Sequence, residues 1–443
     1  MADSNFPRFT AIIVGGSLVG LTTALALEKA GINYVLLEKG EIAPHLGASI
    51  SIHPHTQRVM EQLGVWPEIK ATAVPLDIRK HYDRKGKLFE DSSILQEISK
   101  MTSQRWTTFI ERRFMLSCIF NQIEDKSHIR TQTCVASFTE TEDGVEVVTD
   151  KGETVKGDIL LGADGIHSTI RKLMADKVAI TNPTASQEMQ AGFTSTYHCI
   201  FATSKNARVS DGTQFLPSGG VHNVYYPGFS GVVAIGVPGF AYWFMFVKSE
   251  KETRMPKIPK FTEEDTEATI AKYGGYALGP GYTFKDLWDS RVKANMLSLE
   301  DGVLKSKWNT GGRVALMGDS VHKSTINVGL GGNLAVEGVV HLVNGLVALV
   351  RQCDESGRKP SKTEITAVLD AYEEKQRPHA KTIVTMSRYV TRYEAMETWW
   401  LRLLRRVSPW VSDKTKAKAF VGYINEAPWL NFLPDPYEKQ ELS

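Results

Sequence analysis

The feature that most constrains the fold is a continuous segment near the start of the chain. A β-branched apolar run at residues 9–14 (FTAIIV) leads into a glycine-rich turn at residues 15–20 (GGSLVG), and helix-forming residues follow at 21–30 (LTTALALEKA). A second apolar run at residues 33–37 (NYVLL) ends at Glu38. Apolar runs of this kind are typical of buried parallel strands, so the segment predicts a βαβ unit within an α/β fold.

The glycine-rich turn predicts a site for a pyrophosphate. Gly15 permits the tight turn, Gly20 lets the helix pack closely on the strand, and the helix N-terminus offers free amides to an anion. Ser17 replaces the middle glycine of the GxGxxG pattern, and its hydroxyl can donate to phosphate. Glu38, roughly twenty positions beyond the last glycine, would accept hydrogen bonds from a ribose 2′-hydroxyl. The competing interpretation is an α/β turn without a ligand.

A second glycine-rich segment lies at residues 313–337 (RVALMGDSVHKSTINVGLGGNLAVE), where an apolar strand leads through Gly-Asp into a glycine-rich loop and a helix. Together the two segments suggest one large cofactor held from both ends of the chain. Residues 190–247 contain several apolar strands and predict a mostly antiparallel sheet distinct from the nucleotide-binding domain. Residues 261–299 are polar, and we expect them to be helical.

Composition and charge narrow the class of protein. The 443 residues exceed the length that one hydrophobic core usually stabilises, which favours more than one domain. The 52 basic and 50 acidic residues nearly balance, so the chain lacks the strong positive charge typical of nucleic-acid-binding proteins. The four cysteines are scattered without a CxxC pair, so no metal site is predicted. The start of the chain lacks a signal-peptide pattern, and the longest apolar stretch, residues 339–350, is too short to span a bilayer. We therefore expect a cytoplasmic protein without a transmembrane segment.

Three motifs occur in order along the chain: GGSLVG with Glu38, residues 162–171 (GADGIHSTIR) and residues 313–323 (RVALMGDSVHK). Together they resemble the para-hydroxybenzoate hydroxylase-like, single-component FAD monooxygenases, over residues 8–385 or so. A closer similarity is to the fungal secondary-metabolite branch, which acts on prenylated indole alkaloids, indole diterpenes and meroterpenoids. The segments that carry it are IIVGGSLVGL, GAS at 47–49, FIERRFML at 109–116, GDSVHK and FLPDP.

The resemblance implies an α/β fold in three parts. These are a Rossmann-like FAD-binding domain, an inserted, mostly antiparallel β-sheet substrate domain, and a helical C-terminal region. The implied boundaries give the FAD-binding domain residues 1–75, 106–185 and 301–355, the substrate domain residues 76–105 and 186–300, and the helical region residues 356–443.

The resemblance also implies which residues contact FAD. Glu38 would hold the adenosine ribose, Arg112 would reach the phosphates or the ribityl chain with Arg113 as its rival, and Asp319 would accept a ribityl hydroxyl. Asp164 would serve both FAD and a reduced nicotinamide, NADPH or NADH, although an Asp-Gly turn before a helix suits helix capping equally well. The other implied contacts are Gly15, Ser17 and Gly20 at the pyrophosphate, Gly47 and Ala48 on the flavin side, and Gly332 and Asn333 beside the isoalloxazine.

Two positions depart from the family pattern in the loop beneath the flavin. Family members commonly carry proline where this chain has Ile326, and glutamine where it has Leu330. Because Gly329, Gly331 and Gly332 are retained, we expect FAD binding to persist while the reacting face becomes more apolar.

Reduced flavin and dioxygen give a hydroperoxide in this family, so the protein must supply a dry, shaped pocket rather than a nucleophile. The chain accordingly shows no evident Ser-His-Asp or paired-carboxylate motif. Two side chains are catalytic candidates. His198, on the strand face opposite Phe201, could hydrogen-bond the substrate or the hydroperoxide, or could be structural. Tyr225 could donate a phenol hydrogen bond or pack half-buried. The aromatic residues 242–244 could line a cavity or fill a core.

The expected activity is epoxidation or hydroxylation of a small hydrophobic substrate, a prenylated indole or a terpenoid, through the flavin hydroperoxide with dioxygen and a reduced nicotinamide. Indole 2,3-epoxidation leading to a spiro-oxindole and alkene epoxidation of a prenyl chain are two concrete forms. The alternatives are a flavin-dependent oxidase or reductase without oxygen insertion, and a non-catalytic flavin- or NAD-binding module. The tryptophan- and arginine-rich tail, residues 397–411, suggests either loose contact with a membrane surface or a helix packed across the two domains.

Overall fold

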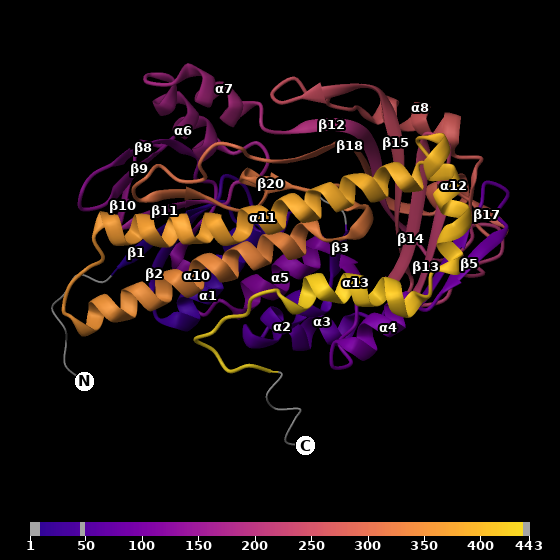
Figure 1. Cartoon of the computed structure of the whole chain (residues 1–443), viewed down its shortest axis with the longest axis horizontal. Coiled ribbons are helices and arrows are strands. Elements are labelled where there is room, and N and C mark those ends of the chain that lie inside the picture. Colours follow the sequence, from indigo (N-terminus) through magenta and orange to yellow (C-terminus); the bar gives the residue numbers. More distant parts are fainter. Residues whose placement is uncertain (1–8, 45–48, 437–443) are drawn as a thin grey trace.

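The computed structural model describes residues 9–44 and 49–436. Figure 1 shows an elongated molecule with a parallel sheet towards one end and a large, mostly antiparallel sheet towards the other. Two long helices, α10 (Gly331–Glu355) and α11 (Lys362–Glu394), lie alongside each other, and α11 extends from the parallel sheet to the large sheet. The cavity described below lies between these two sheets.

The parallel sheet is assembled from segments far apart in the sequence. Its five strands lie in the order β19-β11-β1-β2-β7, and all neighbouring pairs are parallel. The strands are β1 (Thr10–Val14), β2 (Asn33–Leu37), β7 (Ile129–Arg130), β11 (Ile159–Gly162) and β19 (Val314–Leu316). Strand β1 is central and its apolar side chains are fully buried, as expected for a parallel strand covered on both faces.

Two glycines permit the turn between β1 and α1 (Leu18–Ala30). Gly15 has a φ of 110°, and a Cβ there would lie 2.5 Å from the Ala163 carbonyl oxygen. At Gly20 a Cβ would lie 1.8 Å from the Gly15 carbonyl oxygen. A side chain therefore fits at neither position, and Gly20 lets α1 pack closely against the turn.

Shorter elements complete this half of the molecule. Strands β3 (Ser49–Ile52) and β6 (Thr108–Glu111) pair with each other, and the predicted hairpin becomes β8 (Val135–Glu140) and β9 (Val145–Thr149), extended by β10 (Thr154–Gly157). The helices are α2 (Pro54–Gln62), α3 (Trp66–Thr72), α4 (Ile94–Met101), α5 (Arg112–Gln122), α6 (Thr169–Ala179) and α7 (Pro183–Gln190).

The large sheet has eight strands in the order β20-β18-β12-β15-β14-β13-β4-β5. They are β4 (Ile78–Tyr82), β5 (Leu88–Ser92), β12 (Thr194–Lys205), β13 (Gly220–Tyr226), β14 (Phe229–Val237), β15 (Phe240–Arg254), β18 (Arg291–Val303) and β20 (His322–Lys323). All neighbouring pairs are antiparallel except β13 and β4. Strands β4 and β5, from residues 76–105, thus lie in the same sheet as the strands of the later segment.

Alternation along the strands gives this sheet two different apolar faces. The outer face carries Trp243 and packs against α9 (Phe284–Asp289), which contributes Phe284. The inner face carries Tyr197, Phe244 and Phe246 and faces the cavity and α11. A row of aromatic residues in one strand is therefore divided between a closed core and the inner face.

The expectation of helix throughout residues 261–299 is wrong in part. Helices α8 (Glu263–Tyr273) and α9 lie there, together with a small ribbon of β16 (Ala277–Gly279) and β17 (Tyr282–Thr283). From Arg291 onward, however, the chain is strand β18, which pairs with β12 along its length. Hydrogen bonding to a long neighbouring strand overrides the polar composition of this segment.

Helix α10 forms the centre of the molecule. Within the described residues it is the one helix long and apolar enough to cross a membrane, and 78% of its apolar window is buried inside the protein. Its Glu337 is buried between two histidines, His55 of α2 and His379 of α11, whose Nε2 atoms lie 3.1 and 3.0 Å from the carboxylate. Helix α10 is therefore a core helix whose buried carboxylate contacts a histidine on each of two neighbouring helices.

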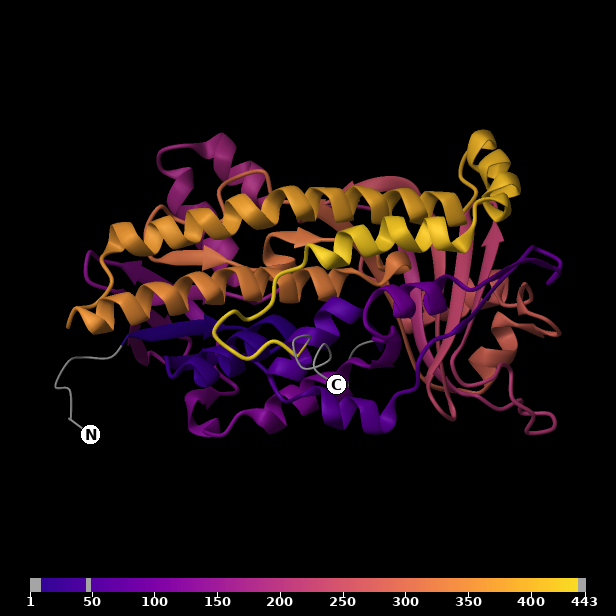
Figure 2. The same cartoon turned by 60° about the horizontal axis from the view of Figure 1, so that its bottom comes forward.

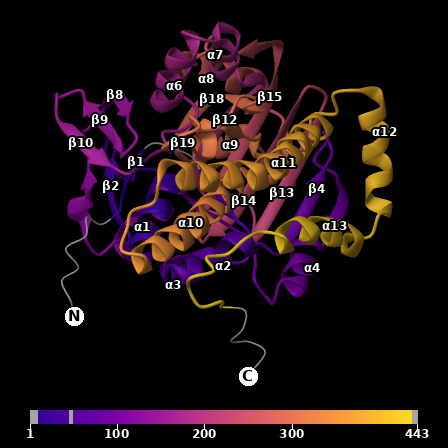
Figure 3. The ribbon, with the colours of Figure 1, turned by 60° about the vertical axis from the view of Figure 1, so that its left-hand side comes forward.

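The C-terminal helices lie against the large sheet and the lower helices (Figures 2 and 3). They are α12 (Trp399–Val407) and α13 (Asp413–Asn425), and α13 packs against α4 and α2. Only Leu401 of α12 is buried, whereas Trp399 is 76% exposed. Helix α12 follows α11 at the edge of the molecule and does not pack across the two domains.

Candidate functional site

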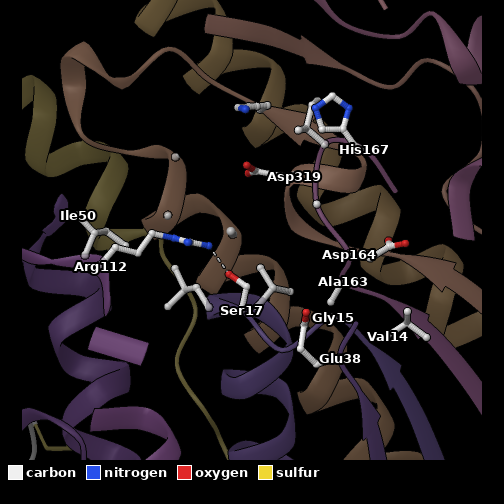
Figure 4. Close-up of a pocket in the computed structure, with 18 of the residues that line it drawn as sticks. Val14, Gly15, Ser17, Glu38, Ile50, Arg112, Ala163, Asp164, His167 and Asp319 are labelled. Atoms are coloured by element: carbon white, nitrogen blue, oxygen red, sulfur yellow. Dashed lines mark hydrogen bonds between the residues drawn. The ribbon is translucent and has the colours of Figure 1, made fainter. Parts of the chain in front are cut away.

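A cavity of about 580 Å³ lies where the two sheets meet. The β1–α1 turn, the end of β2, strand β3, the start of α5 and the loop after β11 line one part of it. The loop from Asp319 to Gly332 and the inner face of the large sheet line the rest. Figure 4 shows polar side chains from these separate segments gathered around it. The two glycine-rich segments of the sequence therefore do meet at one site.

The N-terminus of α1 forms a positive end of this cavity. Its N-cap residue, Ser17, makes no side-chain capping bond, and the first turn carries no acid. The Arg112 guanidinium donates to the Ser17 hydroxyl instead (Figure 4). Burial lowers the pKa of Arg112, while the nearby Asp319 and Glu38 carboxylates favour its charged form. Free helix amides beside a buried guanidinium make an anion site suited to a pyrophosphate.

Glu38 closes the neighbouring part of the cavity at the end of β2. Its two carboxylate oxygens accept the Gly16 amide at 2.5 Å and the Gly40 amide at 2.8 Å. The backbone therefore fixes the carboxylate, while each oxygen retains a lone pair for a further donor such as a ribose hydroxyl.

Asp164 and Asp319 bring two more carboxylates to the cavity (Figure 4). Asp164 accepts the Ile170 amide at 3.1 Å, and Ser168 caps α6, so the capping interpretation is observed. The other oxygen of Asp164, Oδ1, is buried without a hydrogen-bond partner among the described residues. Burial raises the pKa of both carboxyls. An unsatisfied buried acceptor of this kind costs about 1–3 kcal/mol.

A second helix N-terminus faces the same cavity at the start of α10. Its N-cap, Leu330, supplies no capping side chain, and the first turn again lacks an acid. Gly331 and Gly332 line the cavity, and a Cβ on Gly332 would lie 2.7 Å from Ile50 Cδ1. Glycine thus lets the positive end of α10 approach β3 and leaves its amides for a negatively charged group.

The opposite end of the cavity is apolar. It is formed by Phe109 of β6, Phe201 of β12, Phe244 of β15 and Ile326. The Phe201 and Phe244 rings meet edge to face with centroids 5.7 Å apart, and Phe109 lies 6.0 Å from Phe244. Anion-binding groups and an aromatic wall therefore share one continuous cavity.

Comparison with known proteins identifies this arrangement. Residues 8–387 match a family described as the FAD binding domain. The chain belongs to this family. Among its curated relatives, the FAD-dependent monooxygenase cdmI of Talaromyces verruculosus is 31% identical over 98% of this chain and 88% of its own length. The FAD-dependent monooxygenase nodM of Hypoxylon pulicicidum is 33% identical over 97% of this chain and 90% of its own length.

A solved structure shares the fold. HpxO of Klebsiella pneumoniae, complexed with FAD and uric acid, superimposes with a TM-score of 0.73 and 20% identity, covering 95% of this chain and 97% of that one. The predicted fold class and the resemblance to the fungal secondary-metabolite branch are therefore confirmed. So is the enzyme class, an FAD-dependent monooxygenase.

The residues present fit FAD. The two helix N-termini and Arg112 suit its phosphates and the electron-rich ring. Seven of the predicted contact residues line the cavity: Gly15, Ser17, Glu38, Arg112, Asp164, Asp319 and Gly332. Their individual contacts with FAD stay predictions. Gly47 and Ala48 lie outside the described residues.

Three of the predicted positions, Gly20, Asn333 and Arg113, do not line the cavity. Gly20 does not line the cavity and serves helix packing. Asn333 is also absent from the lining; its side chain accepts the His53 amide at 3.0 Å and donates to the Gly329 carbonyl at 2.7 Å, so it fastens the loop. Of the two candidate arginines, Arg112 reaches the cavity, whereas the Arg113 side chain donates to the Ala43 carbonyl.

Neither predicted catalytic side chain reaches the cavity. His198 lies on the outer face of β12, where its Nδ1 contacts Ser249 Oγ at 3.2 Å and its ring packs against Phe261. Strand alternation places it opposite Phe201, which does line the cavity. Tyr225 is on the inner face but is buried, with its hydroxyl 2.7 Å from His81 Nδ1. The geometry supports structural roles for both.

Other residues that line the cavity were not predicted from the sequence. His167 and Lys323 line the cavity, and both lie within motifs that had been noted for their aspartates. The apolar wall was visible only as aromatic residues in strands, because the face that turns inward depends on how the sheet docks. Of the two departures from the family pattern, Ile326 lines the cavity, but Leu330 is buried in the core.

Proposed function

We propose that this protein uses a reduced nicotinamide, NADPH or NADH, and dioxygen to epoxidise or hydroxylate a hydrophobic polycyclic natural product in secondary metabolism. One observation carries the proposal: the FAD-binding part of the cavity continues directly into the wall formed by Phe109, Phe201, Phe244 and Ile326. Such a wall favours an apolar, aromatic substrate over a charged one. Bound FAD would accept hydride from the nicotinamide and activate dioxygen.

The chain's own residues would bind, orient and exclude water. Arg112 with the α1 amides would hold the pyrophosphate, and Asp319 would orient the ribityl chain. The amides at Gly331 and Gly332 would stabilise negative charge on the ring. The aromatic wall would keep water from the reacting atoms, which is what oxygen transfer from an activated flavin demands.

An indole-containing substrate is the specific form that we propose. Its flat, electron-rich rings can stack on or pack edge to face with Phe201 and Phe244, as these rings already pack with each other. Oxygen transfer to the indole 2,3-bond followed by rearrangement would give a spiro-oxindole, and transfer to a prenyl double bond would give an epoxide. For the nicotinamide, Lys323 and His167 are polar groups in the same cavity, with Lys323 paired to Glu300 at 2.9 Å.

Labelled dioxygen tests the proposal. The FAD-loaded protein is mixed with a prenylated indole, NADPH or NADH, and ¹⁸O₂, and the product is analysed by mass spectrometry. We expect one labelled oxygen atom in the product, with the second reduced to water. Turnover of the indole without label would identify an oxidase or reductase. A flavin that neither nicotinamide reduces, even with the indole present, would favour a binding module.

A further inference from the structure

Glu394, the last residue of α11, is a buried carboxylate outside the cavity lining. It is 3% exposed and lies where the end of α11 packs against β13, β14 and the short helix η3 (Ile326–Val328). The Asn327 side-chain amide donates to one of its oxygens at 2.5 Å, and the Asn223 amide approaches the other at 3.4 Å. The carboxylate therefore joins the cavity loop to the large sheet.

Asn327 occupies the centre of that loop. Its neighbours Ile326 and Gly329 both line the cavity, whereas the Asn327 side chain points away from it, towards α11. A second bond reinforces the attachment, because the Thr391 hydroxyl of α11 donates to Asn327 Oδ1 at 2.7 Å. The end of α11 is thus hydrogen-bonded to the side of the loop that faces away from the cavity.

The surroundings of Glu394 contain little that would stabilise a negative charge. No cationic side chain lies within 4.0 Å of it in the part of the chain that the structure describes. Arg79 of β4 is the positive charge that acts on it, and this guanidinium donates to Asn223 at 3.1 Å. The other titratable groups facing it are Tyr225 of β13, Tyr393 of α11 and, further out, Glu90 of β5, with Arg405 of α12 acting on Tyr393.

We propose that Glu394 is a titratable positioning residue, whose neutral form holds the Thr325–Gly329 loop against α11 and whose ionised form releases it, so that pH sets the affinity for FAD. The proposal rests on the proposed function only for its FAD readout. In the neutral form the carbonyl oxygen can still accept the Asn327 amide, and the protonated oxygen gives up only the weak 3.4 Å contact with the Asn223 amide. An ionised one in this apolar setting would gain more from hydration than from remaining buried.

The direction of the pH dependence follows from burial. Burial raises the pKa of Glu394 to about 7, although the Asn327 hydrogen bond and Arg79 oppose the shift. A released, hydrated Glu394 titrates near its ordinary value of 4.5. Protonation of Glu394 therefore stabilises the held conformation of the loop fully below pH 4.5, and this stabilisation decreases as the pH rises from 4.5 to 7. Above pH 7 it decreases no further.

The test compares Glu394→Gln, which keeps the shape and the acceptor but cannot ionise, with the wild-type chain. FAD is removed, and its dissociation constant is measured by flavin fluorescence between pH 5.5 and 7.5. We expect a rise of about tenfold in the wild type and a flat profile in the variant, since one ionisation shifts an equilibrium at most tenfold per pH unit. Glu397→Gln is the matched control, because Glu397 binds Lys248 and Arg392 and does not touch the loop.

Hydrogen exchange of residues 324–330 in the flavin-free protein gives a second readout. We expect wild-type protection to fall with pH relative to Glu394→Gln, and Asn327→Ala to lose the pH-dependent difference together with the link itself. Identical profiles for the wild type and Glu394→Gln in both measurements would overturn the proposal. A chain that binds no FAD yet shows pH-dependent loop exchange would overturn the flavin function and the link to FAD affinity, and would leave only the pH-dependent release of the loop.

Discussion

Replacement of Gly20 by alanine tests the packing on which the cofactor end depends. The new Cβ would lie 1.8 Å from the Gly15 carbonyl oxygen. An ordinary contact is about 3.5 Å, so α1 and the turn must separate by about 1.7 Å. The turn cannot yield easily, because the Gly15 amide donates to the Leu37 carbonyl at 2.8 Å. Helix α1 cannot yield either, since its side chains are buried against the sheet and α10.

The expected cost follows from these constraints. Overpacking a core typically costs about 1–3 kcal/mol, and a clash between two backbone-fixed atoms belongs at the upper end. Alanine recovers about 1 kcal/mol through its higher helix propensity. We therefore expect Gly20→Ala to lower the free energy of unfolding by about 2 kcal/mol. It should also weaken FAD binding, because the α1 amides move.

Urea denaturation of the FAD-free protein, with FAD titration alongside, measures both effects. Gly422→Ala is the matched control, since Gly422 also lies in a helix, α13, and a Cβ there meets nothing within 4 Å. We expect that variant to be more stable than the wild type by about 0.5–1 kcal/mol. If Gly20→Ala were stabilised like Gly422→Ala, the close approach of α1 to the turn would be refuted.

Three further predictions concern substitutions at Arg112, Glu337 and His198. Arg112→Met should raise the FAD dissociation constant about 30-fold, the equivalent of one charged hydrogen bond of about 2 kcal/mol, whereas Arg113→Met should leave it unchanged in the same fluorescence titration. Burial alone would raise the pKa of Glu337, but hydrogen bonds from His379 and His55 outweigh burial and lower this pKa to about 2. Glu337→Gln should therefore cost about 3 kcal/mol in urea unfolding at pH 6, and the difference should shrink as the pH falls from 4.5 towards 2; a difference independent of pH would contradict the pairing. His198→Ala should leave labelled-oxygen incorporation unchanged, and a loss of label with intact folding would place His198 in catalysis after all.

The N-terminal unit was predictable because its signals are local. The apolar run, the glycines and the acid that ends β2 all act within one βαβ unit, so their spacing fixes their arrangement. Arg112 and Asp319 are distant in sequence, and only the family resemblance brought them to the same site. The structure then shows why they belong there, since both lie beside the N-terminus of α1.

The errors arise where docking rather than local pattern decides. Alternation places His198 and Phe201 on opposite faces, but only the packing of α11 and the cavity loop determines which face is inner. Strand β18 has a polar composition and becomes a strand because β12 offers it a partner. For Asn333 only a backbone contact with the flavin ring was predicted, and no pattern in the sequence reveals that its side chain fastens the loop.

The assembly of the parallel sheet from distant segments has a consequence for biosynthesis. Helix α1 packs against α10, which follows it about 300 residues later in the chain, and β11 pairs with β19, which follows about 150 residues later. At roughly 5–20 residues per second, a ribosome needs roughly 15–60 s after the synthesis of α1 to reach α10. During that time the apolar face of α1 and an open strand edge are exposed in the nascent chain. A fragment that stops before β19 would leave both exposed, because α1 and β11 would then lack the partners that cover them in the folded chain.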